Sequence, residues 1–441
     1  MSRKLYIETY GCQMNFSDSE IVGSILSENN CVLEDDVNSA DIILINTCSI
    51  RENAEKRVFN RLRNLRYLKK SNPLLIIGVI GCMAERLKED LLKKEPAVDL
   101  IVGPDAYRDL PKLLKEVDLG DKAVQTLLSE DETYDDILPV RIDSNGVSAF
   151  ISIMRGCQNF CAYCVVPYTR GKERSRNPQT IINEAKTLVE NGFREVTLLG
   201  QNVNSYLWEE TGETVNFSKL MAMVAEINPL LRVRFATSHP KDLSDELIAT
   251  IKKYPNICKS IHLPLQSGSN NVLKKMNRKY TREWYLGRVN AIKTAIPDCG
   301  ISTDIITGFC GETEEDHKDT LSLMREVGYD SAFMFKYSER PGTTAAKCYE
   351  NDIPEEVKSR RLEEIIALQS ELSLASNKKD IGKTFEILVE GQSKRSKKQL
   401  FGRNSQNKVI IFTSTDEKIG DYVIVKVTDC TAATLFGEVV K

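Results

Sequence analysis

The sequence predicts an α/β protein in three parts: an N-terminal doubly wound parallel sheet, a central open barrel of strand–helix units, and a small C-terminal β-barrel. Three observations carry this prediction. Strand and helix patterns alternate through the first 120 residues, the alternation resumes near residue 148, and short β-branched strands replace it after residue 377. Alternating strands and helices indicate a parallel sheet, whereas short strands between turn residues indicate an all-β module.

The N-terminal part shows apolar segments of strand length, with helix-like segments between or after them. The expected strands cover residues 4–9, 41–46 and 74–80. The expected helices cover residues 17–28, 52–70 and 86–94. An acidic stretch at 129–136 has the character of a solvated linker. We therefore expect an N-terminal domain over 3–120 and a linker over 121–142.

The central part repeats the strand–helix pattern six times. Its expected strands cover residues 149–154, 195–199, 232–235, 260–264, 300–306 and 331–335. Six units are too few for a closed eight-stranded barrel, but they fit an open, partial (β/α)6 barrel that resembles a TIM barrel. This domain is expected over 143–376.

A helix expected at 354–377 separates the central part from a region of different character. Short strands are expected there at 385–390, 409–412, 421–427 and 435–440. Gly, Asn and Asp turns lie between them, a pattern typical of a small all-β barrel. The third domain is therefore expected over 377–441.

Composition limits the functional classes. The 441 residues include 60 Lys or Arg and 63 Asp or Glu, and a net charge of −3 argues neither for nor against nucleic acid. No run of 18 apolar residues predicts a membrane span, and the N-terminus lacks the features of a secretory signal. Twelve cysteines in such a chain indicate metal ligands or reduced thiols, so we expect a reducing, cytoplasmic location.

Three cysteines, Cys157, Cys161 and Cys164, form the pattern CxxxCxxC. Three thiolates this close can hold an iron–sulfur cluster, which normally takes four. With three, one iron keeps an open coordination position, where chemistry can take place. The alternatives are a zinc site or three free thiols. Zinc usually pairs two CxxC units or adds histidines, and neither lies close in the sequence.

Three further cysteines, Cys12, Cys48 and Cys82, each follow an apolar strand directly. Ligands of open α/β sheets bind outside the carboxyl ends of the strands, so these thiols are expected to converge and to hold a second cluster. Gly11 and Gly81 precede two of them and allow a close approach of the backbone. The alternative is that they pack as small apolar residues. That reading is preferred for the remaining six cysteines: Cys31, Cys258, Cys299, Cys310, Cys348 and Cys430.

The motifs around these cysteines resemble the radical S-adenosylmethionine (SAM) methylthiotransferase family, most closely its MiaB type. The matching stretches cover residues 8–15, 46–51, 79–86, 154–176, 199–206, 262–269 and 335–343. The resemblance covers nearly the whole chain. One departure is Cys310, which stands where the family pattern has proline.

The resemblance implies that the CxxxCxxC loop holds a 4Fe–4S cluster that binds SAM, and that Cys12, Cys48 and Cys82 hold an auxiliary 4Fe–4S cluster that carries sulfur. One SAM yields a radical on reduction and a second supplies the methyl group. The implied product is 2-methylthio-N6-isopentenyladenosine next to the tRNA anticodon. A radical is needed because the hydrogen on C2 of adenine is not a leaving group.

Residues for SAM are expected at the ends of the central strands and in the cluster loop. The candidates are Tyr163, Gln201, Asn202, Gln266 and Asp304. Each has an alternative role, because amides at strand ends also form turns and an aromatic ring can pack beneath the loop. His262 is interpreted as a hydrogen-bonded core histidine rather than a catalytic one.

The C-terminal part carries ten Lys or Arg and seven Asp or Glu between residues 381 and 441. It resembles a TRAM domain, an RNA-binding barrel. Its basic stretch 394–403, interpreted as a loop, suits a phosphate backbone. The RNA-binding candidates are Lys394, Arg395, Lys397, Lys398, Phe401 and Arg403. A second basic run at 56–70 is interpreted as a solvated helix face.

The expected partners are a tRNA anticodon stem–loop carrying isopentenyladenosine and an electron donor such as flavodoxin or ferredoxin. A monomer without membrane attachment is expected. Two other methylthiotransferase substrates remain open: threonylcarbamoyladenosine of tRNA and a ribosomal-protein aspartate. A different class is a non-enzymatic iron–sulfur RNA-binding protein. Open irons argue against it, because an electron carrier gains nothing from them.

Overall fold

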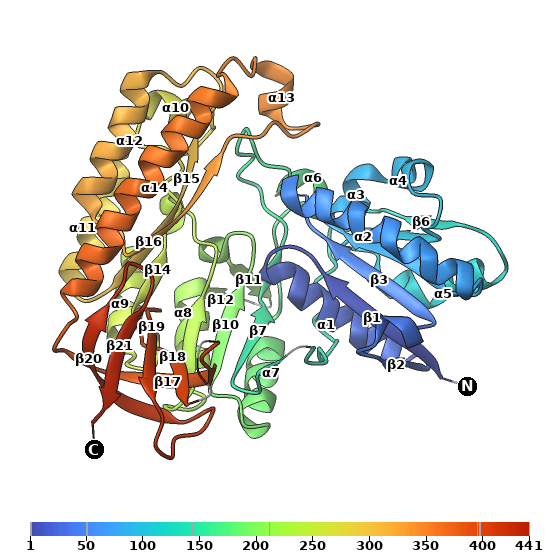
Figure 1. The fold of residues 1–441 in the computed structure, drawn as a ribbon, viewed down its shortest axis with the longest axis horizontal. Coiled ribbons are helices and arrows are strands. Elements are labelled where there is room, and N and C mark those ends of the chain that lie inside the picture. Colours follow the sequence, from blue (N-terminus) through green and yellow to red (C-terminus); the bar gives the residue numbers. More distant parts are fainter. Residues whose placement is uncertain are drawn as a thin grey trace.

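The computed structural model describes residues 2–49, 52–142, 144–210, 212–394, 396 and 398–440, with the side chains of 52–54 left out. The chain forms the three expected parts (Figure 1). The N-terminal domain lies beside the central half-barrel, and the C-terminal barrel lies below it in this view.

The N-terminal domain is a six-stranded parallel sheet in the order β2-β1-β3-β4-β5-β6. Its strands are β1 (Arg3–Thr9), β2 (Cys31–Leu33), β3 (Ile42–Thr47), β4 (Ile76–Gly81), β5 (Leu100–Val102) and β6 (Ala123–Gln125). Its helices are α1 (Gln13–Ser27), α2 (Glu52–Ser71), α3 (Cys82–Leu87), α4 (Glu89–Lys94) and α5 (Leu110–Asp118). Because helices cover both faces, β3 and β4 are buried along their whole length.

One sequence interpretation of this domain is wrong, and a second holds only in part. The helix expected at 86–94 is interrupted, because Lys88 adopts φ +50° between α3 and α4. The acidic stretch is solvated only in part. Glu130, Asp131 and Asp136 are exposed, but Tyr134 is 1% exposed and its hydroxyl donates to the Pro104 carbonyl at 3.0 Å. Arg108 also pairs with Glu132 at 2.5 Å. The connection between the first two domains is therefore packed against the sheet.

The central domain contains six parallel strands: β7 (Ser148–Ser152), β10 (Glu195–Leu199), β13 (Arg232–Phe235), β14 (Ser260–His262), β15 (Gly300–Thr307) and β16 (Ser331–Lys336). They form sheets β7-β10-β13 and β14-β15-β16, linked where the Cys258 amide donates to the Val233 carbonyl at 2.9 Å. The partial barrel is confirmed. Two short two-stranded pairs flank it, β8 (Met154–Arg155) with β9 (Arg174–Ser175) and β11 (Leu207–Glu210) with β12 (Glu213–Asn216).

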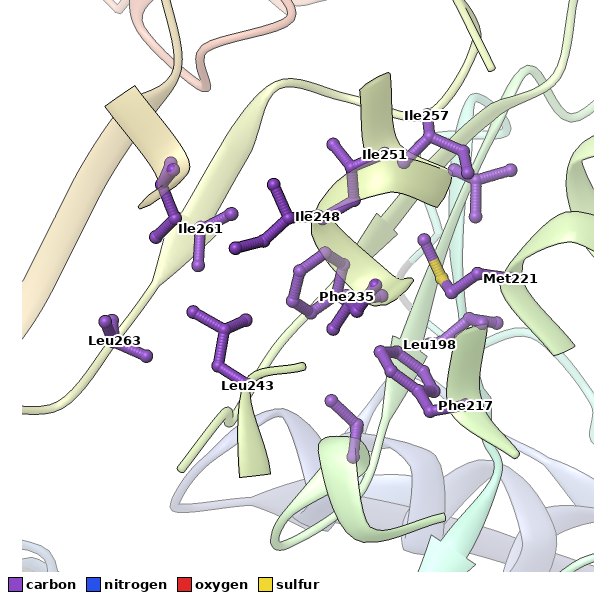
Figure 2. Close-up of a cluster of buried hydrophobic side chains, with 14 of the residues drawn as sticks. Leu198, Phe217, Met221, Phe235, Leu243, Ile248, Ile251, Ile257, Ile261 and Leu263 are labelled. Atoms are coloured by element: carbon purple, nitrogen blue, oxygen red, sulfur yellow. The ribbon is translucent and has the colours of Figure 1, made fainter. Parts of the chain in front are cut away.

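Helices surround the outside of the half-barrel. The longer ones are α7 (Pro178–Glu190), α8 (Phe217–Ala225), α9 (Asp245–Lys253), α11 (Arg282–Ala295), α12 (Glu314–Val327) and α14 (Glu355–Lys378). Figure 2 shows how Phe217 and Met221 of α8 and Ile248 and Ile251 of α9 pack with strand residues such as Phe235. Their three- and four-residue spacings place each pair on one helix face, so the sheet and the helices share one core.

Three short helices lie near the carboxyl ends of the strands and position the site. They are α6 (Val166–Arg170), α10 (Asn270–Lys275) and α13 (Thr344–Cys348). A Pro in the first turn favours the start of α6, since its missing N–H would be unpaired there in any case.

The C-terminal domain is a closed barrel of β17 (Thr384–Gln392), β18 (Gln399–Arg403), β19 (Val409–Thr413), β20 (Tyr422–Cys430) and β21 (Leu435–Val439). The interpretation of 394–403 as one loop is wrong, because its second half is β18. The barrel docks at the amino end of β13, where Arg232 donates to the Arg403 carbonyl at 2.6 Å and Arg234 to the Asn404 carbonyl at 2.9 Å. Within the described residues, none of the helices combines the length and the apolar character that crossing a membrane requires.

Candidate active site

The N-terminal cysteines lie at one edge of the first sheet. Cys12 caps α1 after β1, Cys48 follows β3, and Cys82 begins α3 after β4. Two glycines allow this convergence. A Cβ on Gly11 would lie 2.7 Å from the Cβ of Cys48, and Gly81 adopts φ +91° with the Thr47 carbonyl 2.8 Å from where its Cβ would be.

The surroundings shift the pKa values of Cys12 and Cys82 in opposite directions. A hydrogen bond with Cys48 and the nearby Arg170 guanidinium lower the pKa of Cys12 to about 6, although burial opposes them. Burial raises the pKa of Cys82, while Arg170 acts in the opposite direction. A lowered pKa favours the thiolate of Cys12, which is the form that binds metals.

A buried ionic network joins this edge to the central domain. Arg170 Nε donates to Cys82 Sγ at 3.2 Å, and its Nη2 donates to Asp18 Oδ2 at 2.6 Å. Asp18 also accepts from Arg155 Nη1 at 2.8 Å, and Arg174 pairs with Asp105 at 3.0 Å. The aspartates belong to the first domain and the arginines to the second. Sequence interpretation did not single out any of these residues, although Arg155, Arg170 and Arg174 lie within the motif 154–176.

The CxxxCxxC cysteines lie in the loop between β8 and α6. Cys161 Sγ accepts from Arg278 Nη1 at 3.2 Å, Cys157 Sγ from Asn159 Nδ2 at 3.5 Å, and Cys164 Sγ from the Val166 amide at 3.5 Å. Burial raises the pKa of Cys157 to about 11 and also raises that of Cys164. Bound iron would favour the thiolate form of both, since metal ligation displaces the thiol proton.

Neither set of three thiols forms a site for one metal ion. Among the described residues, no group of three or more His, Cys, Asp or Glu side chains is arranged to hold a metal ion. A 4Fe–4S cluster makes a different demand, since each thiolate binds a separate iron. Each set has one buried arginine donating to a sulfur, which suits an anionic cluster–thiolate group.

Buried polar atoms without partners gather at the carboxyl ends of the central strands. Among the described residues, both amide atoms of Gln201, both of Asn204, Gln266 Oε1, Ser238 Oγ and His239 Nε2 have no hydrogen-bond partner. Buried polar groups are nearly always paired, so a cluster of exceptions indicates a place for a polar ligand. Gln201 and Gln266 were candidates from the sequence, whereas Asn204, Ser238 and His239 were missed.

The remaining SAM candidates have at least one partner within the protein. Asn202 Nδ2 donates to Asp242 at 2.7 Å, although its Oδ1 is buried without a hydrogen-bond partner. The Tyr163 ring packs edge-on against Phe309 with centroids 6.4 Å apart. Asp304 lies 3.5 Å from His262 Nε2. His262 Nδ1 also contacts Ser302 Oγ at 3.0 Å, so this histidine is hydrogen-bonded, but its side chain is 21% exposed and does not belong to the core.

The RNA candidates do not all remain available for phosphate. Lys394 and Lys398 are exposed, whereas Arg403 pairs with Glu390 at 2.6 Å and Phe401 is half-buried in β18. Arg395 and Lys397 lie outside the described residues. Cys310 is buried beside Phe309 and Tyr337 in an apolar cluster, as expected for a cysteine without a ligand role.

A half-barrel of six parallel strands with a three-cysteine loop and unpaired polar groups at its strand ends is the architecture of a radical SAM protein. Family models agree: residues 151–324 match the Radical SAM superfamily, 4–103 match Uncharacterized protein family UPF0004, and 378–440 match the TRAM domain. Among solved structures, the chain is similar to the radical SAM methyltransferase TsrM from Kitasatospora setae. The TM-score is 0.56 at 12% identity, with 78% of this chain and 75% of that chain covered, which shows the shared fold.

Curated relatives narrow the class. The chain is 59% identical over 438 residues to the tRNA-2-methylthio-N(6)-dimethylallyladenosine synthase of Bacteroides thetaiotaomicron. The match covers 99% of this chain and 96% of that relative. The same-named protein of Amoebophilus asiaticus is 57% identical, with 100% of this chain and 93% of the relative covered. The chain belongs to the tRNA-2-methylthio-N(6)-dimethylallyladenosine synthase family, which confirms the MiaB-type resemblance.

Proposed function

We propose that this enzyme attaches a methylthio group to C2 of N6-isopentenyladenosine next to the tRNA anticodon, with two SAM molecules and two 4Fe–4S clusters. One observation carries the proposal. Arg170, in the helix after the CxxxCxxC loop, reaches Cys82 Sγ in the other cysteine set at 3.2 Å. Two clusters held by these sets would therefore lie near the same domain interface, where one substrate can meet both.

The proposed ligands are Cys12, Cys48 and Cys82 for the auxiliary cluster, and Cys157, Cys161 and Cys164 for the cluster that binds SAM. When bound, the clusters and SAM supply radical chemistry, sulfur and a methyl group. Gln201 and Gln266 would bind the polar atoms of SAM, because their amides are buried with unpaired atoms. Asn202, Asp304 and Tyr163 would shape the site through the contacts described above.

The protein's own charges prepare the two cluster sites. Arg170 and Arg278 are almost fully buried, and each donates to one ligand sulfur. A guanidinium next to a thiolate stabilises negative charge more strongly in a buried site than in water. The same burial excludes water, which protects reactive species from side reactions.

For substrate binding, we propose that Lys394, Arg395, Lys397 and Lys398 contact tRNA phosphates, with lesser roles for Phe401 and Arg403. A flavodoxin or ferredoxin would supply electrons to a monomeric, cytoplasmic enzyme. We place the central domain at 143–376 and the C-terminal domain at 377–441. The N-terminal boundary expected at 120 falls short of β6 (Ala123–Gln125), which belongs to the N-terminal sheet, so the connection begins after β6.

Reconstituted enzyme incubated with three tRNAs tests this function. The tRNAs carry isopentenyladenosine, threonylcarbamoyladenosine or unmodified adenosine, and mass spectrometry of nucleosides measures the product. We expect the 2-methylthio product on the isopentenylated tRNA alone. A product on the threonylcarbamoylated tRNA, or on a ribosomal-protein aspartate, would assign a different substrate.

A further inference from the structure

We propose that an aromatic surface beside the CxxxCxxC loop stacks an unpaired nucleotide of the substrate RNA. We call this surface the aromatic platform, and define it as Phe160, Tyr168 and Lys347. The inference rests on the proposed function, because it takes the anticodon loop as the occupant. It adds an RNA contact in the central domain, separate from the C-terminal barrel.

The two rings of the platform are exposed although they are large and apolar. Phe160 is 47% exposed and Tyr168 is 43% exposed. Their centroids lie 6.2 Å apart at an interplanar angle of 76°, so the rings meet edge to face. Single exposed aromatics are common, but two in contact beside a reaction site indicate a binding surface. Nucleobases stack on such rings regardless of base identity.

The loop that carries Phe160 is held in place by hydrogen bonds from two other segments, Met276–Asn277 and Ala345. The Ala162 amide donates to the Met276 carbonyl at 2.9 Å, and the Ala162 carbonyl accepts from the Ala345 amide at 2.7 Å. Asn277 Nδ2 donates to the Phe160 carbonyl at 2.9 Å. Ala162, Met276 and Ala345 also share one buried apolar cluster. Binding to a surface that is already ordered loses little conformational entropy.

Lysines lie on two of the segments that contact the platform. Lys347 Nζ lies 5.9 Å from the centroid of the Tyr168 ring. The run that supplies Met276 and Asn277 also carries three exposed lysines: Lys274, Lys275 and Lys279. Aromatic rings among cations are the combination that binds single-stranded nucleic acid, since bases stack and phosphates pair with the lysines. This charge pattern favours RNA over an apolar protein partner.

The location favours a nucleotide close to the reacting adenosine. Phe160 directly precedes Cys161, and Tyr168 lies on α6 two residues before Arg170. Figure 1 places α13 at the end of the central domain away from the C-terminal barrel, and α6 between the central domain and α3 of the N-terminal domain. RNA that contacts both the barrel and the platform would therefore extend along the central domain, with its unpaired loop at the cluster end.

Fluorescence of an anticodon stem–loop RNA with 2-aminopurine beside the target adenosine tests the platform. Stacking quenches this base, so the full-length holoenzyme is expected to quench it on binding. Phe160→Leu and Tyr168→Leu keep apolar volume but remove the ring. We expect each to lose quenching and to weaken affinity about five- to a hundredfold. Phe160→Tyr and Tyr168→Phe keep an aromatic ring, so their quenching and affinity should equal those of the unchanged protein. This comparison separates loss of stacking from a folding defect.

Trp284→Leu is the matched control, because Trp284 is a 49% exposed aromatic on α11. Its affinity and quenching should equal those of the unchanged protein. Leucine variants that bind and quench normally would overturn the platform, as would an unchanged protein that binds the RNA without quenching. If quenching follows this pattern but isopentenylated tRNA gains no methylthio group, the proposed function fails while the RNA site stands.

Discussion

Arg170 Nε donates to Cys82 Sγ at 3.2 Å, and this contact crosses from the central domain to the N-terminal domain. The second branch of the same guanidinium binds Asp18, again in the N-terminal domain. One side chain of the central domain therefore contacts both a proposed cluster ligand and the buried carboxylate beneath it. A cluster held by Cys82 would thereby have its reduction potential linked to the packing between the domains.

Arg170→Met should lower the reduction potential of the auxiliary cluster. The hydrogen bond to the ligand sulfur and the nearby positive charge both stabilise the reduced cluster. Their removal therefore lowers the potential. The measurement is a redox titration followed by electron paramagnetic resonance, in a chain whose CxxxCxxC cysteines are Ala. Arg170→Lys keeps the charge and should shift the potential less. An unchanged potential in Arg170→Met would contradict the contact's importance.

Replacing Cys157, Cys161 and Cys164 together with Ala should halve the bound iron and abolish reductive SAM cleavage. The reason is that only this set is proposed to leave an iron open to SAM. Iron analysis and chromatography of 5′-deoxyadenosine measure the two effects. Release of 5′-deoxyadenosine by the triple variant would show that the assignment is wrong.

Replacing Cys12, Cys48 and Cys82 with Ala should separate the two halves of the chemistry. The other cluster and reductive SAM cleavage should remain, while the methylthio product disappears from the tRNA. Iron content, SAM cleavage and nucleoside mass spectrometry are compared in one preparation. Complete loss of iron would instead mean that the two domains assemble their clusters as one unit.

Asp18→Ala should destabilise the protein strongly, because it leaves Arg155 and Arg170 buried without their shared carboxylate. Breaking a buried ion pair from one side costs about 3–5 kcal/mol. Urea unfolding of the apo chain measures the change. The matched control is Asp118→Ala, which removes the partly exposed pair with Arg3 and should cost about 1 kcal/mol or less. Equal losses of unfolding free energy in the two variants would show that the buried network stabilises the protein no more than the exposed pair does.

Changing Lys394, Arg395, Lys397 and Lys398 to Ala should weaken tRNA binding and flatten its salt dependence. Each lost phosphate contact lowers the slope of log affinity against log salt by about 0.7 to 0.9. Filter binding at several salt concentrations measures the slope. Arg403→Ala should change it less, because Arg403 already pairs with Glu390. Preference for isopentenylated over unmodified adenosine should stay the same, since phosphate contacts carry no base identity.

Local patterns predicted much of the fold. The strands expected at 195–199 and 232–235 match β10 and β13 at both ends. The first is rich in branched residues and is followed by Gly200, and in the second Val233 and Phe235 alternate with arginines. β2, β5 and β6 have three residues each, too few for a periodic signal. β18 was missed because its sequence follows a run of lysines and contains Gly402, which weakens a strand pattern.

The sequence predicted those site residues that form a recognisable local pattern. The two cysteine sets stand out by spacing and by position after strands. The contact between Arg155 and Asp18 spans 137 residues, and no local pattern marks two such residues as partners. Charged residues are expected at the surface unless they are paired, so burial of this network is a property of the assembled domains.

The buried position of Tyr134 has a consequence for how substrate reaches the clusters. A connection that packs against its own domain gives the two cysteine sets no loose tether between them, and the buried pair of Arg155 with Asp18 holds the same domain boundary. An RNA loop that reaches both sets would therefore have to turn its adenosine out of the stack toward them.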